Sequence, residues 1–145
     1  MSATPPSEAV GLRPVVAVFN SADDVIEVLR VALEGAGFVV VSAKLSEIQS
    51  GFMDLVAFVH ENGPVAIVYD IPRPYEANWN FLRLLRETES LSRLGWVLTT
   101  LHKEALEAAV GPANVVEIVL GKPYSLDDVV GAVRQALSSD EHRPQ

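Results

Sequence analysis

The sequence predicts an α/β protein in which five βα units form a doubly wound, five-stranded parallel sheet. Short apolar, β-branched segments alternate along the chain with segments of helical periodicity. Each short segment is too continuously apolar for an amphipathic helix and is typical of a strand buried on both faces. The chain has 145 residues, which suits a single domain with one core.

The strands are predicted from runs of apolar residues. They are PVVAVF (14–19), FVVVSA (38–43), PVAIVY (64–69), GWVLTT (95–100) and VVEIVL (115–120). Since parallel strands need crossover connections, the helical segments between them complete the βα units.

The first predicted helix follows the first strand. Ser21 and Asp24 are spaced as a capping box at its start, and Gly37 ends it. Its predicted buried face comprises Val25, Val28, Leu29, Ala32 and Leu33.

Four further helices are predicted from the same periodicity. One helix is expected over 46–63, closed by Asn62 and Gly63, another from Asn78, a short one over 102–110, and the last from a capping box of Ser125 and Asp128. Their predicted core positions are, in order, Ile48, Phe52, Leu55, Val56 and Val59; Phe81, Leu82 and Leu85; Leu106, Ala109 and Val110; Val129, Val130, Val133 and Leu137.

The ends of the chain are expected to be flexible tails. Residues 1–13 are rich in Ser, Pro and Ala, and residues 139–145 are polar, so the folded domain is predicted over 14–138. A second, output-type domain has no room in this length, and the domain is expected to stand alone.

Composition argues against several classes of function. Eleven Lys and Arg against 19 Asp and Glu give a net charge of −8, which opposes contact with nucleic acid or anionic membranes. There is no Cys, which excludes disulfides and thiol chemistry, and His60, His102 and His142 lack metal-ligand spacing. Without an apolar span or signal peptide, a cytoplasmic location is expected.

Polar groups end four of the predicted strands. They are Asn20 with Ser21, then Asp70, then Thr99 with Thr100, and finally Lys122. In a doubly wound sheet the carboxyl ends of the strands form the functional crevice, so these groups are expected to meet there.

With these residues the chain resembles the receiver domain of two-component response regulators over about 14–138. Asp70 with Pro74 matches the phosphoacceptor and its proline, Thr99 the strand-four hydroxyl, and Lys122-Pro123-Tyr124 the Lys-Pro-aromatic motif. The resemblance implies a flavodoxin-like (CheY-like) strand order of 2-1-3-4-5.

The resemblance also implies a chemistry for these residues. Asp70 is the candidate phosphoacceptor, Thr99 the switch hydroxyl, and Lys122 the charge partner of the phosphoryl group. In the family a magnesium ion is held by the phosphoacceptor, by the backbone carbonyl two residues later, here Pro72, and by an acidic pair that ends strand one.

The acidic pair is replaced by Asn20 and Ser21, which offer only neutral oxygens. The metal site of Asp70, Asn20, Ser21 and the Pro72 carbonyl is therefore predicted to be degenerate, with no cofactor or weakly bound magnesium. Asp23 and Asp24 are the alternative pair, but both suit the first helical turn, and using them would move Val25 and Val28 off the buried face.

Other positions also depart from the family pattern. Val119 replaces the switch aromatic, Thr100 a small residue, and Asn78 a glycine, where an asparagine tolerates left-handed backbone. Arg73 lies beside the site, where it either supplies part of the missing charge or is a solvated loop arginine.

The sequence therefore predicts an atypical receiver in phosphorelay signalling that works mainly through protein–protein contacts with impaired metal-dependent phosphorylation. It is not expected to be an enzyme beyond self-phosphorylation. A histidine kinase or another signalling protein is the expected partner, and a homodimer is also possible. The candidate surface includes Tyr124 and residues 111–119.

The alternative is a working phosphoacceptor that takes phosphate onto Asp70. A flavodoxin-like small-molecule binder is disfavoured because no glycine-rich loop follows the first strand.

Overall fold

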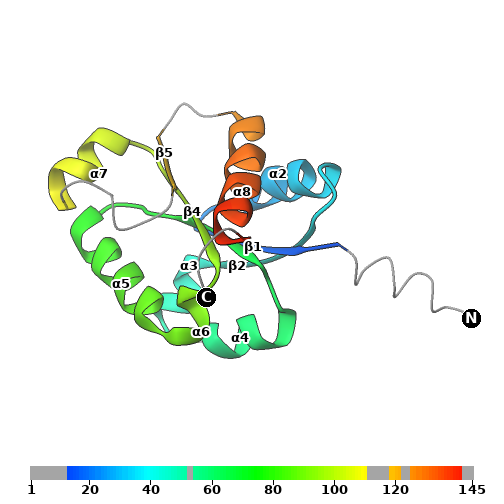
Figure 1. The fold of residues 1–145 in the computed structure, drawn as a ribbon. Helices are drawn as coiled ribbons and strands as arrows, with labels where there is room; N and C mark the ends of the chain where they lie inside the picture. The colour runs from blue at the N-terminus through cyan, green and yellow to red at the C-terminus, as the bar shows by residue number, and fades with distance from the viewer. Residues whose placement is uncertain (1–12, 52–53, 111–117, 122–124, 142–145) are drawn as a thin grey trace, which may run out of the picture.

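The computed structural model describes residues 13–51, 54–110, 118–121 and 125–141, and the side chains of 118–121 and 139–141 lie outside the description. A five-stranded parallel sheet runs in the order β2-β1-β3-β4-β5 (Figure 1). The strands are β1 (Val15–Asn20), β2 (Val39–Lys44), β3 (Ala66–Asp70), β4 (Gly95–Thr100) and β5 (Ile118–Gly121). This architecture and strand order confirm the predicted fold class.

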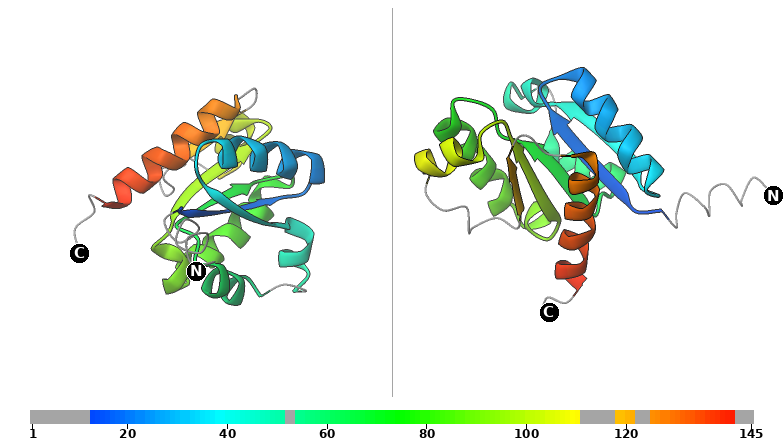
Figure 2. Two further views of the ribbon diagram at one scale, coloured as in Figure 1. Left: turned by 90° about the vertical axis from the view of Figure 1, so that its right-hand side faces the viewer. Right: turned by 90° about the horizontal axis from the view of Figure 1, so that it is seen from above.

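Helices cover both faces of the sheet (Figures 1 and 2). One face carries α2 (Asp23–Gly35) and α8 (Leu126–Glu141). The other carries α3 (Leu45–Gln49), α4 (Leu55–Asn62), α5 (Tyr75–Glu87), α6 (Glu89–Ser92) and α7 (Lys103–Val110). Since α8 continues to Glu141, the last helix runs past the predicted end of the domain at 138.

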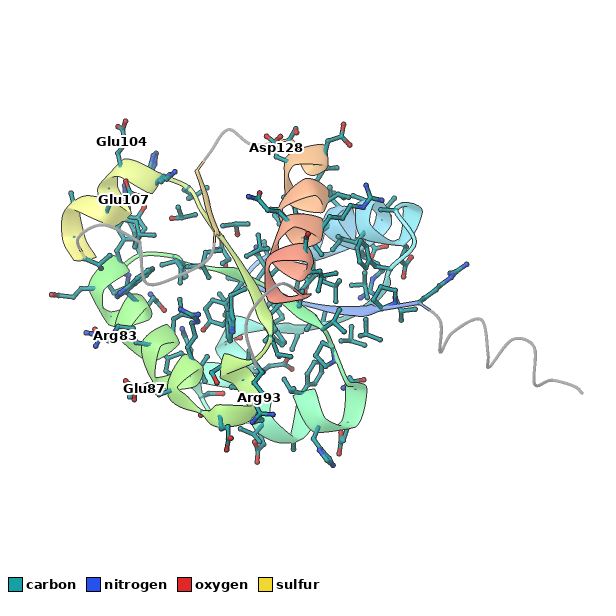
Figure 3. The ribbon with its side chains drawn as sticks, in the orientation of Figure 1. Arg83, Glu87, Arg93, Glu104, Glu107 and Asp128 are labelled. Carbon is teal, nitrogen blue, oxygen red and sulfur yellow. The ribbon has the colours of Figure 1, made fainter. Side chains whose placement is uncertain are left out.

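Alternate residues of each central strand enter two separate apolar cores. In β1, Val16 and Val18 pack under α2 and α8, whereas Ala17 and Phe19 pack under the helices of the other face. A strand with both faces covered needs apolar side chains at every position, which explains the continuous apolar runs in the sequence. Charged side chains such as Arg83, Glu87, Arg93 and Glu104 lie on the outer surfaces of the helices (Figure 3).

The buried face of α2 differs from the prediction. Ile26, Leu29 and Leu33 are buried, whereas Val28 is 48% exposed. At the N-terminal end of the helix the buried face therefore includes Ile26 in place of the predicted Val25 and Val28. Val25 is half-buried at the margin of this face. The predicted capping box is also wrong, because Ala22 is the N-cap and makes no side-chain cap bond.

The segment predicted as one helix over 46–63 forms two, α3 and α4. Gly51 has φ +86°, a left-handed conformation that ends a helix, and Asp54 starts α4 by accepting a hydrogen bond from Ala57 N at 3.2 Å. The break turns α4 so that Val56 is 43% exposed, against prediction, while Leu55 and Val59 are buried. Phe52 lies outside the described residues.

The remaining helix predictions are confirmed in part. Gly63, in a left-handed conformation, closes α4, and Ser125 and Asp128 form the predicted capping box, with Asp128 N donating to Ser125 Oγ at 3.1 Å. α5 begins at Tyr75 rather than at Asn78, and Ala109 of α7 is exposed.

Within the described ranges, no helix combines the length and apolar character that crossing a bilayer requires.

The corrected face of α2 leads to a stability prediction. Leu29→Ala should lower the free energy of unfolding by about 2–5 kcal/mol, because it leaves a cavity in the core. Val28→Ala should change it by no more than about 0.5 kcal/mol, because that side chain is half in solvent. Urea denaturation of both variants tests this, and an equal loss for the two would contradict the described orientation of α2.

Candidate functional site

The site is organised by the parallel pairing of β3 with β4. Register places Asp70 opposite Thr99, whose side chain is fully buried. The Thr99 hydroxyl donates a hydrogen bond to Asp70 Oδ1 at 2.8 Å. Two sequence-predicted site residues, 29 positions apart, are thus joined directly.

The backbone just after Asp70 is fixed by the same pair of strands. Ile71 N donates to Thr99 O at 2.8 Å, and the Thr100 hydroxyl donates to Ile71 O at 3.1 Å. Thr100, where the family has a small residue, is 1% exposed. Its hydroxyl therefore satisfies a buried carbonyl instead of reaching into the crevice.

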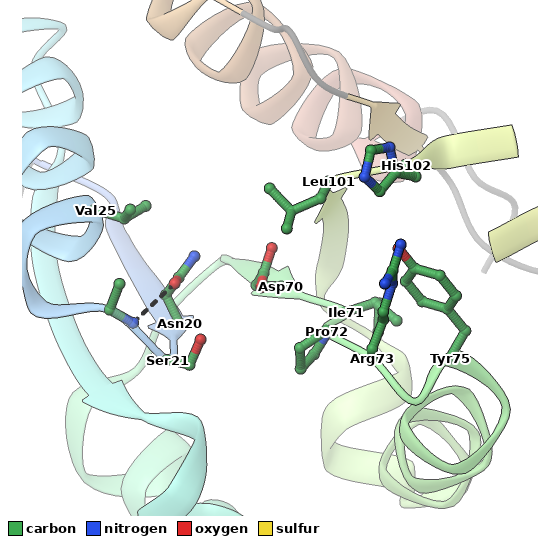
Figure 4. Close-up of a pocket in the computed structure, with 11 residues that line it drawn as sticks. Asn20, Ser21, Val25, Asp70, Ile71, Pro72, Arg73, Tyr75, Leu101 and His102 are labelled. Atoms are coloured by element: carbon green, nitrogen blue, oxygen red, sulfur yellow. Dashed lines mark hydrogen bonds between the residues drawn. The ribbon is translucent and has the colours of Figure 1, made fainter. Parts of the chain in front are cut away.

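Asn20 ends β1 and faces Asp70 across the crevice (Figure 4). Its side chain is almost fully buried, and its Oδ1 accepts a hydrogen bond from Ala22 N at 3.1 Å. This bond closes the turn into α2, which is a local structural use of the amide oxygen. Ser21 is exposed at the edge of the crevice.

The alternative acidic pair lies away from the crevice. Asp23 and Asp24 are both in the first turn of α2. Asp23 pairs with Lys44 at 3.5 Å, and Asp24 Oδ1 accepts from Val25 N at 3.0 Å. Neither lines the cavity beside Asp70. Asn20 and Ser21 do line this cavity. Val28, whose predicted burial was one argument for aligning Asn20 and Ser21 with the acidic pair, is not buried.

The loop after β3 is held by the side chain of Asn78. Asn78 Nδ2 donates to Pro72 O at 3.0 Å and to Pro74 O at 2.9 Å, and its Oδ1 accepts from Gln49 Nε2 at 2.6 Å. Asn78 lies within α5, not in left-handed backbone, so the predicted reason for tolerating asparagine here is wrong. Its contribution comes from its side chain.

A cavity of about 500 Å³ opens beside Asp70 (Figure 4). Besides Asn20, Ser21 and Asp70, it is lined by Ala22, Val25, Ile71, Pro72, Arg73, Tyr75, Leu101 and His102. The Arg73 guanidinium lies over the Tyr75 ring, 5.9 Å from its centroid, so its charge is held near the crevice. The peptide bond between Arg73 and Pro74 is cis.

No function was predicted from the sequence for His102 or Tyr75, yet both line this cavity. His102, which lacks metal-ligand spacing in the sequence, is an exposed residue at the rim of the cavity. Tyr75 directly follows Pro74 and begins α5. Their place in the sequence could have indicated this, because residues just beyond the ends of β3 and β4 belong to the loops that surround the crevice.

Several predicted residues cannot be placed. Lys122, Pro123 and Tyr124 lie outside the described residues, as do 111–117 and the side chain of Val119.

The described oxygen atoms are a poor fit to magnesium, which favours carboxylates in octahedral geometry. Of the ligands implied by the resemblance, Asp70 alone carries charge. The Asn20 amide oxygen and the Pro72 carbonyl already accept hydrogen bonds within the chain. In the described part of the chain, no three or more His, Cys, Asp or Glu side chains are grouped to hold a metal ion.

Tyr69 precedes Asp70 but takes no part in the crevice. Burial between the apolar side chains of the core raises the pKa of its phenol well above the ordinary value, so the hydroxyl stays neutral at any physiological pH. Its ring packs edge-on against Phe19 and lies 6.0 Å from Trp96, which makes it part of the core below Asp70.

Solved structures of bacterial signalling proteins, signal receiver domains among them, have a similar fold. A sensor protein from Polaromonas sp. JS666 aligns with a TM-score of 0.72 at 19% identity, covering 88% of this chain and 98% of that one. A response regulator from Thermotoga maritima aligns with a TM-score of 0.64 at 21% identity, covering 88% and 99%. The chemotaxis protein CheY4 of Vibrio cholerae aligns with a TM-score of 0.63 at 17% identity, covering 86% and 99%.

By sequence, no protein-family model matches the chain, and no curated protein matches it either. The structural likeness therefore establishes a receiver-type, CheY-like fold, and the chemistry has to be argued from the site itself.

The hydrogen bonds of Asn78 lead to a stability prediction. Asn78→Ala removes three side-chain hydrogen bonds and should lower the free energy of unfolding by about 2 kcal/mol. Pro72 O loses its side-chain donor, whereas Pro74 O still accepts from the backbone N of residue 78 at 3.1 Å. Asn62→Ala is the matched control, because Asn62 Nδ2 donates one bond, to Phe58 O at 2.9 Å, at the other edge of the sheet. The control should lose about 1 kcal/mol or less. Equal losses in thermal or urea denaturation would mean that the loop does not depend on Asn78.

Proposed function

We propose that the chain is an atypical receiver domain that acts in two-component signalling mainly through protein–protein contacts, with impaired metal-dependent phosphorylation. The fold, which is similar to that of solved receiver domains, supports the signalling class. The crevice at the carboxyl end of the sheet, where Asp70 meets Thr99, supports a receiver-type site.

The observation that carries the atypical assignment is the end of β1. Attack by a carboxylate on a phosphoryl group brings several negative oxygens together, and charge compensation supplies most of the catalysis. Asn20 brings no charge, and its amide oxygen is engaged by Ala22 N at 3.1 Å. Arg73 adds one exposed cation near the crevice, which compensates only weakly in water.

A signal from such a domain leaves through its surface. We propose that the partners are signalling proteins, a histidine kinase among them, and that a homodimer is a second form of assembly. The net charge of −8 supports protein partners rather than nucleic acid or anionic membranes. On this proposal the domain binds no cofactor tightly, catalyses no reaction beyond its own phosphorylation, and works in the cytoplasm.

A second function, that of a working phosphoacceptor, is favoured by one contact. The hydroxyl of Thr99, 2.8 Å from Asp70 Oδ1, is near enough to move its hydrogen bond to a phosphoryl oxygen on that carboxylate. This function needs the charge of the metal site to be replaced by other groups.

Phosphorylation measured by intact mass separates the two functions. With a small acyl phosphate and millimolar magnesium, the native chain should gain little or no phosphoryl group. The Asn20→Asp/Ser21→Asp variant should gain one, because both missing charges are restored, and adding Asp70→Asn should abolish that gain. A full phosphoryl gain by the native chain, lost in Asp70→Asn alone, would establish the working phosphoacceptor instead.

A further inference from the structure

The Pro72 carbonyl, which the receiver resemblance assigns to the metal, is engaged by a buried amide. Asn78 is 9% exposed, and its Nδ2 lies 3.0 Å from Pro72 O. We propose that Asn78 is a positioning residue that withholds this carbonyl from a divalent ion and holds the loop after Asp70 in shape without one. The inference rests on the proposed function and identifies a second cause of the weak metal site, separate from the lost charges.

The orientation of the amide follows from its partners. Pro72 O and Pro74 O are carbonyls and only accept, so the nitrogen of Asn78 has to face them. The oxygen then faces Gln49 Nε2, which donates to it at 2.6 Å. Since the three partners come from the end of α3 and from the loop before α5, the amide cannot rotate without losing all of these bonds.

A metal ion would compete directly with this arrangement. Magnesium holds its ligands at about 2.0–2.1 Å in near-ideal octahedral geometry, so the carbonyl has to point at the ion. A carbonyl oxygen has two lone pairs, so the competition is one of geometry. Moving Pro72 O out of line with Asn78 Nδ2 to reach an ion would leave a buried N–H without an acceptor, which is costly. The loop therefore favours the metal-free shape even when the charge at the end of β1 is restored.

Titration calorimetry with magnesium alone tests this inference on the full chain. Asn20→Asp/Ser21→Asp should bind magnesium more tightly than the native chain. Adding Asn78→Ala should tighten binding by about a further ten-fold, the size of effect typical of groups that orient metal ligands. Alanine is the chosen replacement because it keeps the helical propensity of α5.

Three controls make the result specific. Asn62→Ala in the same double variant removes a similar amide-to-carbonyl bond far from the crevice and should leave the affinity unchanged. Asn78→Ala alone should not bind tightly, because the charges are still missing. Gln49→Ala, at an exposed position, removes the bond to Asn78 Oδ1 and should tighten binding in the double variant by a smaller factor. If Asn78→Ala does not fold, Gln49→Ala in the double variant replaces it as the test.

The outcomes distinguish the two proposals. Equal affinity of the double and triple variants, or no gain from Gln49→Ala where the triple variant does not fold, would overturn the role of Asn78 and leave the proposed function standing. Tight binding by the native chain would overturn the proposed function, and the role of Asn78 with it.

Discussion

The parallel pairing of β3 with β4 sets the geometry on which the crevice depends. It places Asp70 opposite Thr99, so that a buried hydroxyl reaches the carboxylate at 2.8 Å. It also aligns Ile71 with Thr99 and Thr100, whose backbone and hydroxyl bonds fix the chain just after Asp70. The helices on both faces bury these strands, and a polar pair at their ends is consequently held in a rigid frame.

Within this frame, the polar groups near Asp70 satisfy one another. Asn20 closes the turn into α2, Asn78 holds the carbonyls of Pro72 and Pro74, and Gln49 holds Asn78. The Asn20 amide oxygen and the Pro72 carbonyl each accept a hydrogen bond that holds them in their present orientation. The neutral end of β1 and the hydrogen bond to the Pro72 carbonyl both support the proposal that this receiver-type crevice binds a divalent ion only weakly.

The sheet could be predicted from the sequence because strands buried on both faces leave a continuous apolar pattern, as in 64–69 and 95–100. Asp70 and Thr99 could be paired because strand ends meet at one edge of a parallel sheet. The break between α3 and α4 and the exposure of Val28 were missed, since periodicity alone does not fix where a helix turns. The use of Asn78 was also missed: its partner Gln49 is 29 residues away, and only the folded chain brings them together.

Paramagnetic relaxation by manganese tests the central claim, that this crevice does not bind a divalent ion tightly, most directly. Substoichiometric Mn²⁺ is added to the isotope-labelled native chain, and amide line widths are compared with those of the Asn20→Asp/Ser21→Asp variant. The account predicts clear broadening of the amides of residues 21, 70 and 71 in the variant, and no selective broadening near Asp70 in the native chain at the same Mn²⁺ concentration. Selective broadening of these amides in the native chain would contradict it.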